Sequence, residues 1–374
     1  VAAGTYSVTQ TDANGCTTLE TISIAEPAAA LQLNASVGHL NCHAQPTGWI
    51  DITVTGGTLD IATFSDMVGT VTLGTLDLAS GTITGSTGML TSSTWTVYNG
   101  TISAIIAGDG GALTKSTPGT VILTRPNLYT GATTISAGIL EIQKNTSLGY
   151  IDGATTVSAG ATLQINGSGL SIPEYITFSG TGHLYTGAIR NKTGNNTLTG
   201  LLTLGAAAMI ESDVGTTLTV DTKGLSATTL GLTIGGDGNI TFTETAPIYG
   251  TTATLTKKDT GVLTLEGLNN FTGATNLSRG EIVLNSAGAM PRSTITIGSG
   301  GTLTLDNSST TILDRISDTA ALTMNGGNFN FIGNIAGTAY ETAGALTSAS
   351  GHNIVTVTPG AGGSTTMTFA SLSR

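Results

Sequence analysis

The chain has 374 residues, of which 53 are Gly, 9% are charged and 5% are aromatic, a profile rich in strand and turn formers. Its formal net charge is -11 with only 12 Lys and Arg residues, which excludes a basic surface for nucleic acid or for an anionic membrane. No apolar run approaches the roughly 18 residues of a membrane-spanning helix. We therefore expect an all-β segment that neither binds nucleic acid nor inserts into a membrane.

The first 57 residues read as two pairs of strands. The stretches "TYSVTQ" and "CTTLETISIAEP" flank the turn "TDANG", and "LQLNASVGHLNC" precedes "TGWIDITVTGG". The chain opens directly in strand-like alternation, so no signal peptide is visible and we expect a segment of a longer protein. A lone hairpin is only marginally stable in water, so these strands need neighbours.

The same stretches resemble the Ig-like repeat of gliding-motility adhesins and related giant bacterial surface proteins. "AAGTYSVTQTDANGCTTLETISIAEP" is similar to the last two strands of one repeat, and "LNASVGHLNCHAQPTGWIDITVTGG" to the first two strands of the next. The middle strands that this family would place after Gly57 are missing. The resemblance implies a partial Ig-like β-sandwich module over residues 1–57.

The only two cysteines, Cys16 and Cys42, allow one disulfide, and two free or separately paired thiols fit the sequence equally well. His39 and His43 lie close to Cys42, but no second Cys/His pair follows at a spacing that would complete a zinc shell. We interpret them as turn residues and expect neither a metal nor a cofactor.

From residue 58 to residue 374 the sequence consists of short strand-like runs punctuated by Gly, Asn and Asp, such as "GTLDIA", "GATLQI" and "GTLTLD". Apolar residues alternate with Thr, and the runs recur at a step of about twenty residues, which predicts a parallel β-solenoid. An antiparallel sandwich is the main alternative. The solenoid is favoured because "GATLQI" and "GTLTLD" each follow a longer repeat at almost the same distance. Roughly fourteen to sixteen coils would extend about 70 Å at the inter-strand spacing.

That longer repeat is "LTKSTPGTVILTRPNLYTGATTISAGILEI" at residues 113–142 and "LTKKDTGVLTLEGLNNFTGATNLSRGEIVL" at residues 255–284, which align without a gap. We expect its lysine at a coil edge, where an exposed charge discourages lateral strand pairing. We expect its Asn and aromatic residue in a turn whose ring closes the core, and the Gly of its Thr-Gly-Ala-Thr to let the chain reverse. The structural positions are Lys115, Gly119, Asn127, Tyr129, Gly131 and Gly138 in the first copy, and Lys257, Gly261, Asn269, Phe271, Gly273 and Gly280 in the second.

Both copies resemble the passenger-associated repeat of autotransporter-type proteins, whose pattern has Leu-Thr-Lys, a Gly-led strand, an Asn with an aromatic residue, Thr-Gly-x-Thr and a second Gly-led strand. Weaker similarity surrounds the copies through most of residues 58–374. The resemblance implies a right-handed parallel β-solenoid on a secreted or surface-exposed protein.

Catalysis would require paired carboxylates, as in the polysaccharide-cleaving enzymes that share β-helical folds. The densest acidic group is Asp306, Asp314 and Asp318, with Arg315 beside it. A carbohydrate-active enzyme is favoured only if these acids converge in a groove, and a solvated loop at a coil corner is the simpler interpretation. We assign no catalytic residue.

The sequence therefore predicts a non-enzymatic extracellular structural or adhesive segment of a large bacterial cell-surface protein. Its partners would be neighbouring segments of the same chain, or further copies that complete the half-built N-terminal module and form a filament. A passenger that binds surface glycans through a Thr/Asn-rich face is the first alternative. It needs aromatic platforms, and Trp49, Trp95 and the Tyr residues do not cluster in sequence.

Overall fold

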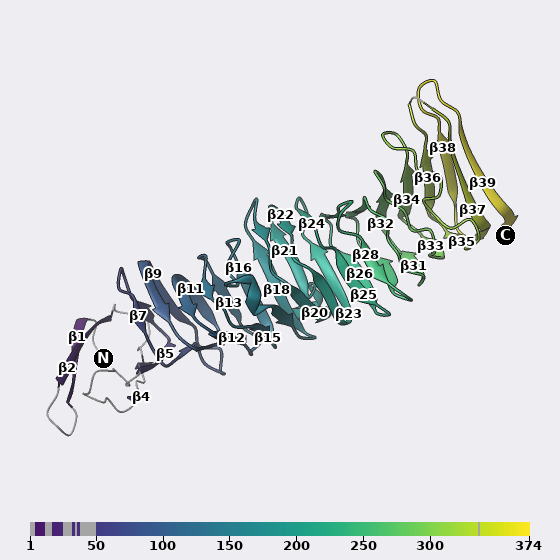
Figure 1. Cartoon of the computed structure of the whole chain (residues 1–374). Helices are drawn as coiled ribbons and strands as arrows, with labels where there is room; N and C mark the ends of the chain where they lie inside the picture. The colour runs from purple at the N-terminus through teal and green to yellow at the C-terminus, as the bar shows by residue number, and fades with distance from the viewer. Residues whose placement is uncertain (1–3, 12–16, 25–31, 34–35, 38–49, 336) are drawn as a thin grey trace. The chain divides into compact units, whose positions relative to one another are not determined.

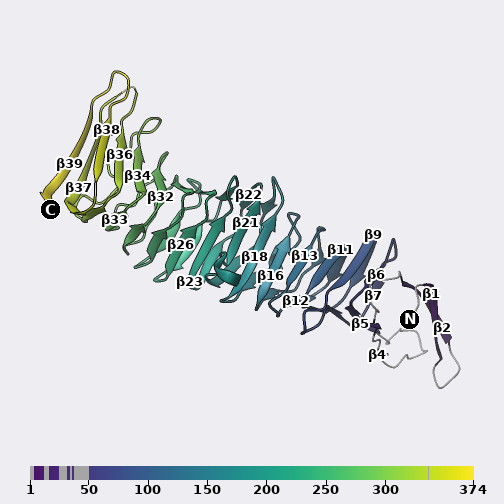
Figure 2. The same ribbon diagram turned by 180° about the vertical axis from the view of Figure 1, so that it is seen from behind.

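The structure is a computed structural model in which strands predominate (Figures 1 and 2). Its described residues contain only two short 3₁₀ segments, η1 (Ile151–Gly153) and η2 (His183–Tyr185). The strands form a parallel β-solenoid of about 14 turns. The chain comprises two compact units, Val1–Gln164 and Ile165–Arg374. The residues that the structure describes are 4–11, 17–24, 32–33, 36–37, 50–335 and 337–374.

The N-terminal part of the first unit contains antiparallel pairs. β1 (Gly4–Thr11) pairs with β2 (Thr17–Ile24), and the short strands β3 (Gln32–Leu33) and β4 (Ser36–Val37) both pair with β5 (Ile50–Thr55). These pairs do not by themselves make a sandwich, so the Ig-like module stays a prediction. β5 also pairs in parallel with the next strand of the solenoid, which means that solenoid pairing already begins within residues 1–57.

The rest of the first unit is built from two parallel ladders. Within each ladder a strand pairs with the strand one coil later, at a step of about twenty residues, as the repeat spacing predicted. The first ladder is β5, β8 (Thr70–Leu73), β10 (Thr94–Val97), β12 (Ala112–Lys115), β15 (Thr133–Ile135) and β17 (Thr155–Val157). The second is β6 (Thr58–Asp60), β9 (Gly81–Thr91), β11 (Gly100–Gly108), β13 (Thr120–Leu123) and β16 (Gly138–Ile142). The remaining strands are β7 (Asp66–Met67), β14 (Leu128–Tyr129) and β18 (Ala161–Asn166), which ends at the start of the second unit.

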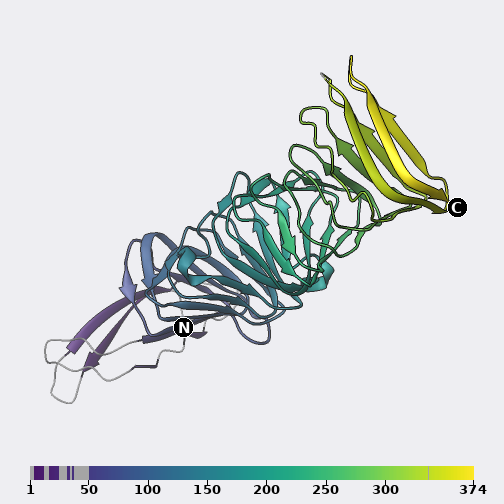
Figure 3. The same cartoon turned by 45° about the vertical axis from the view of Figure 1, so that its right-hand side comes forward.

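The second unit contains a nine-stranded parallel sheet in which each strand comes from a successive coil. Its strands are β19 (Ser171–Ile172), β22 (Asn195–Leu198), β24 (Thr217–Val220), β27 (Asn239–Phe242), β30 (Val262–Leu265), β32 (Gly280–Leu284), β34 (Gly301–Asp306), β36 (Asn328–Ile332) and β38 (Ile354–Thr358). The other strands of the unit are β20 (Ile176–Gly180), β21 (Ile189–Thr193), β23 (Leu202–Ser212), β25 (Leu225–Thr228), β26 (Gly231–Gly235), β28 (Ile248–Gly250), β29 (Thr254–Lys257), β31 (Thr275–Leu277), β33 (Ile295–Gly298), β35 (Leu322–Asn325), β37 (Ala339–Ser350) and β39 (Thr365–Ser373). Figure 3 shows the last of these strands lying side by side, where β37 pairs in parallel with β39.

The core follows from strand alternation and exact stacking of coils. In β24 and β30, Thr faces outward while the aliphatic residues on either side of it are buried, because side chains on a strand alternate between its two faces. Parallel register then places each buried residue over its counterpart in the previous coil. One such row of the second unit is Leu198, Val220, Phe242, Leu265, Leu284, Leu305 and Phe331. The predicted parallel solenoid is thus confirmed over the antiparallel sandwich.

Candidate functional site

The lysines of the two repeats lie in the core, so the expectation of an exposed charge at a coil edge is wrong. Lys115 is 0% exposed and Lys257 is 1% exposed. Lys115 occupies a row of inward residues that also contains Val97 and Ile135, and Lys257 pairs in register with the inward Leu277. The reason is the alternation of the strand: in Leu-Thr-Lys the lysine lies two residues after an inward Leu and therefore faces the same side.

Each buried ammonium group is held by main-chain carbonyl groups. Lys115 Nζ donates to the carbonyl oxygens of Thr117 and, at 3.1 Å, of Ala137. Lys257 Nζ donates to the carbonyl oxygens of Lys258 and, at 2.9 Å, of Asp259. Burial lowers the pKa of each lysine to about 8. The aliphatic stem fills the core row while the ammonium group binds the backbone at the following corner.

The asparagine of each repeat links three successive coils. Asn127 Oδ1 accepts from the Ile106 N–H of the previous coil at 3.2 Å, and its Nδ2 donates to the Ser147 carbonyl of the next coil at 2.7 Å. Asn269 does the same between the Ile248 N–H, at 2.9 Å, and the Ala289 carbonyl, at 3.2 Å. An amide side chain has both a donor and an acceptor, and this position needs both because it lies between an N–H of the previous coil and a carbonyl of the next.

The aromatic residue two positions later is buried in both copies, Tyr129 at 0% and Phe271 at 1% exposure. The Tyr129 hydroxyl lies 2.8 Å from the hydroxyl of Thr133. Phe271 has no hydroxyl, and the equivalent Thr275 instead lies 2.8 Å from the Ser293 hydroxyl. In each copy the ring fills the core beside a Thr whose hydroxyl has a partner, which agrees with the expected place of the ring.

The glycines of the repeat are required by close approach of the backbone. Gly131 and Gly273 do not have positive φ; a Cβ there would lie 2.5 Å and 2.1 Å from a carbonyl oxygen of the previous coil, so space rather than chain reversal explains them. Gly138 and Gly280 have φ of 68° and 75° and would also clash, so they need Gly on both counts. At the remaining pair, Gly119 faces the Asn99 side chain and Gly261 lies against the Gly238 carbonyl.

The acidic residues of the 306–318 segment converge only in part. Asp314 and Asp318 lie with Glu341 so that one carboxylate oxygen from each is within 4.8 Å of the other two. Asp306 does not belong to this group, and its carboxylate accepts from the Ser308 N–H at 2.8 Å. Sequence reasoning missed Glu341 because it lies on β37, and only the stacking of coils brings it to the loop.

Glu341 is fully buried while Asp314 and Asp318 are exposed. Its carboxylate accepts from the backbone N–H groups of Arg315, at 2.9 Å, and Ile316, at 3.4 Å. Burial above all, with a smaller contribution from the two aspartates, raises the pKa of Glu341 to about 7 against the effect of these hydrogen bonds. Burial and the neighbouring Asp318 also raise the pKa of Asp314. The cluster therefore concentrates negative charge that a proton can relieve.

Arg315 organises the loop that carries the two aspartates. Its guanidinium group is fully buried, and burial lowers its pKa to about 10. Among the residues that the structure describes, no carboxylate pairs with this guanidinium group; it donates to one side-chain amide oxygen and to several main-chain carbonyls. These acceptors are Asn307 Oδ1 and the carbonyl oxygens of Ser286, Gly288, Asp306 and Thr310. Arg315 therefore fixes the shape of the loop.

The chemistry open to this cluster is limited. Three carboxylates are hard oxygen donors of the kind that Ca²⁺ prefers, but Ca²⁺ takes about six to eight oxygen ligands. A glycosidase pair would need a sugar site between two acids. Asp306, which the enzyme hypothesis required, lies outside the group. Cys16, Cys42, His39 and His43 lie outside the described residues.

Replacing Asn127 by Ala should destabilise the first repeat locally by about 3 kcal/mol, because the buried Ile106 N–H and Ser147 carbonyl both lose a partner. Hydrogen exchange of the Ile106 amide should become faster. The matched control is Asn239→Ala, since Asn239 is exposed and, among the described residues, its side chain accepts from the Val262 N–H alone. Equal effects of the two substitutions would contradict the inter-coil role.

Replacing Glu341 by Gln should remove a pH dependence of stability. The folded chain holds the Glu341 proton up to about pH 7, whereas an unfolded Glu releases it near 4.5, so the free energy of unfolding should fall as pH rises between these values. The loss should be at most about 3 kcal/mol. Thermal unfolding followed at pH 4.5 to 8 measures it, with exposed Glu244→Gln as control. A slope of undiminished size in Glu341→Gln would refute the assignment, since the raised pKa of Asp314 accounts for only part of it.

Comparison with known proteins gives one match. The model of the passenger-associated-transport-repeat family matches residues 113–142 and residues 255–284, which are the two copies of the repeat. No curated protein and no solved structure matches the chain. Among the described residues, none of the helices has the length and apolar character needed to cross a membrane. The two repeats, within a parallel β-solenoid, fit an autotransporter passenger domain, which is extracellular.

Proposed function

We propose that the chain is a non-enzymatic structural or adhesive segment of a large bacterial cell-surface protein, built as a right-handed solenoid. The main support for the proposal is that the two matched repeats make equivalent contacts in the interior of the solenoid. Lys115 and Lys257, and likewise Asn127 and Asn269, bind the backbone of their own and neighbouring coils. These positions hold the stack together. A crossover connection between parallel strands is almost always right-handed, which supports a right-handed solenoid.

The mechanism that follows is mechanical. Main-chain ladders run from coil to coil, so the hydrogen bonds between strands carry a load along the stack. The outward sides of the strands display Thr-rich faces. The antiparallel strands β1 and β2 could extend such a stack by pairing with a neighbouring copy, because strand addition supplies main-chain hydrogen bonds. Self-association into a filament is therefore part of the proposal.

Display outside the cell can be tested with a pair of cysteine variants in a Cys16→Ser, Cys42→Ser background. Val214 is 78% exposed and Val220 is 0% exposed. On intact cells that make the whole protein, Val214→Cys should react with a membrane-impermeant maleimide, whereas Val220→Cys should react only after denaturation. Labelling of Val214→Cys that requires cell lysis would refute surface display.

Self-association can be tested by electron microscopy and light scattering of the purified protein. We expect particles joined end to end, and we expect Val8→Pro to shorten them, because proline interrupts the β1 ladder in which Val8 pairs with Glu20. Isolated rods at every concentration, with β1 and β2 ordered, would exclude the filament and leave a single-chain passenger.

A further inference from the structure

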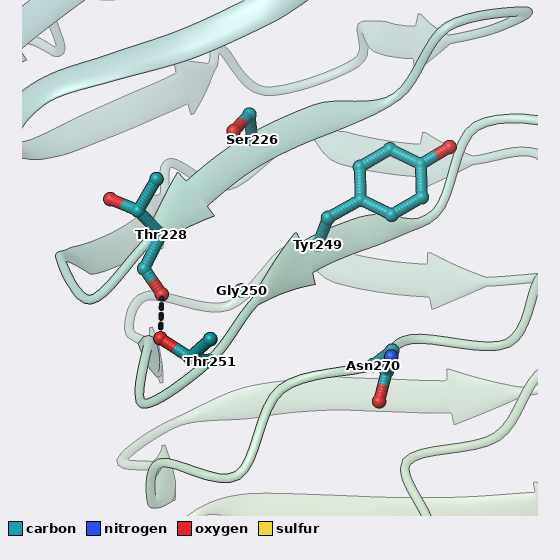
Figure 4. A pocket seen from close by; sticks show the side chains of 6 residues that line it. All are labelled: Ser226, Thr228, Tyr249, Gly250, Thr251 and Asn270. Atoms are coloured by element: carbon teal, nitrogen blue, oxygen red, sulfur yellow. Dashed lines mark hydrogen bonds between the residues drawn. The ribbon is translucent and has the colours of Figure 1, made fainter.

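A shallow pocket of about 330 Å³ lies on the outer surface of three successive coils in the second unit. Register places Ser226 beside Tyr249, and a parallel bridge places Tyr249 beside Asn270. Figure 4 shows the Tyr249 ring projecting from β28 between Ser226 and Asn270. The lining residues are Ser226, Thr228, Tyr249, Gly250, Thr251 and Asn270.

Tyr249 presents a flat apolar ring to solvent. It follows the inward Ile248, so strand alternation turns it outward, where it is 42% exposed. Leu268 lies two residues before Asn270, with buried Asn269 between them, and is 58% exposed on the same outward side. Leu268 is not among the residues that line the pocket, so Tyr249 supplies its one large apolar face. Trp95 contributes no such platform, because it is fully buried in the core.

The polar groups around this ring are free to bind a ligand. Other hydroxyls on the solenoid are used between coils: Thr251 Oγ1 donates to the Thr228 carbonyl at 3.3 Å, and Thr272 Oγ1 to the Thr251 carbonyl at 2.6 Å. Within the described part of the chain, the side chains of Ser226, Tyr249 and Asn270 make no hydrogen bond. They therefore leave donors and acceptors around an aromatic ring.

The charge of the site selects among ligands. None of the lining residues is charged, and the chain as a whole carries -11, which disfavours acidic ligands. The site also lacks the paired carboxylates that hydrolysis of a glycosidic bond needs. A pyranose ring has an apolar C–H face and a rim of hydroxyl groups, so it matches an aromatic platform ringed by neutral donors and acceptors.

We propose that this surface binds a neutral glycan, with a sugar ring stacked on Tyr249 and its hydroxyl groups bound by Ser226 and Asn270. The inference deepens the adhesive part of the proposed function and rests on it, because a solenoid displayed outside the cell meets glycans there. Ser226, Tyr249 and Asn270 lie on successive coils about 4.8 Å apart, so the binding surface extends along the solenoid axis. An extended surface suits a chain of sugars more than a single sugar.

Titration of the whole chain with oligosaccharides tests this inference. The probes are neutral hexamers of glucose, mannose, galactose and N-acetylglucosamine, with oligogalacturonate as the acidic comparison, and binding is measured by calorimetry. We expect one neutral hexamer to bind, Tyr249→Ala to weaken it at least tenfold and Tyr249→Phe to weaken it less. Tyr340→Ala, which removes a 49% exposed Tyr outside the pocket, should have no effect. Unchanged thermal unfolding of the variants shows that they fold.

Three outcomes would overturn the inference: no neutral hexamer binds at millimolar concentration, binding survives Tyr249→Ala, or oligogalacturonate binds better. None of these outcomes bears on whether the protein is displayed outside the cell, because the labelling of Val214→Cys tests that separately. If Val214→Cys is labelled only after lysis and the Tyr249 effect remains, the site stands and the proposed location fails.

Discussion

The structure depends on the main-chain ladder between successive coils. One coil cannot cover its own apolar row, so each inward side chain is buried only when the next coil stacks on it about 4.8 Å away. The row through Leu265, Leu284 and Leu305 shows the result in the second unit. Because the ladder fixes the register, each residue in such a row stacks on its counterparts in the two coils beside it.

Polar residues are tolerated in this interior when the backbone of the stack satisfies them. The lysines and asparagines of the two repeats bind carbonyl and amide groups of their own or adjoining coils, and Arg315 binds main-chain carbonyls around its loop. A buried donor without a partner would cost about 1–3 kcal/mol, so these contacts offset much of the cost of burial. Glu341 also accepts from two backbone N–H groups, and its raised pKa allows protonation to remove its charge.

The sequence predicted what is local or periodic. Alternation, the coil step and the thirty-residue repeat indicated the parallel solenoid and the buried rings of Tyr129 and Phe271. The burial of Lys115 could also have been predicted, since it lies two residues after inward Leu113. The approach of Glu341 to Asp314 could not, because it depends on how a long loop folds under the next coil. The Ser226, Tyr249 and Asn270 surface was equally hidden, since its members are separated by whole coils.

The buried hydroxyl partners of Thr133 and Thr275 come from different places in the two copies. In the first copy the partner comes from Tyr129, and the residue two before the next coil's strand is Gly153, whose Cβ would lie 2.3 Å from the Gly131 carbonyl oxygen. In the second copy that residue is Ser293, and the ring is Phe271, which carries no hydroxyl. The two copies therefore supply one hydroxyl group from different positions. A buried threonine in this interior can thus find its hydroxyl partner in its own coil or in the next one, and the position that is not used is then occupied by Phe or Gly.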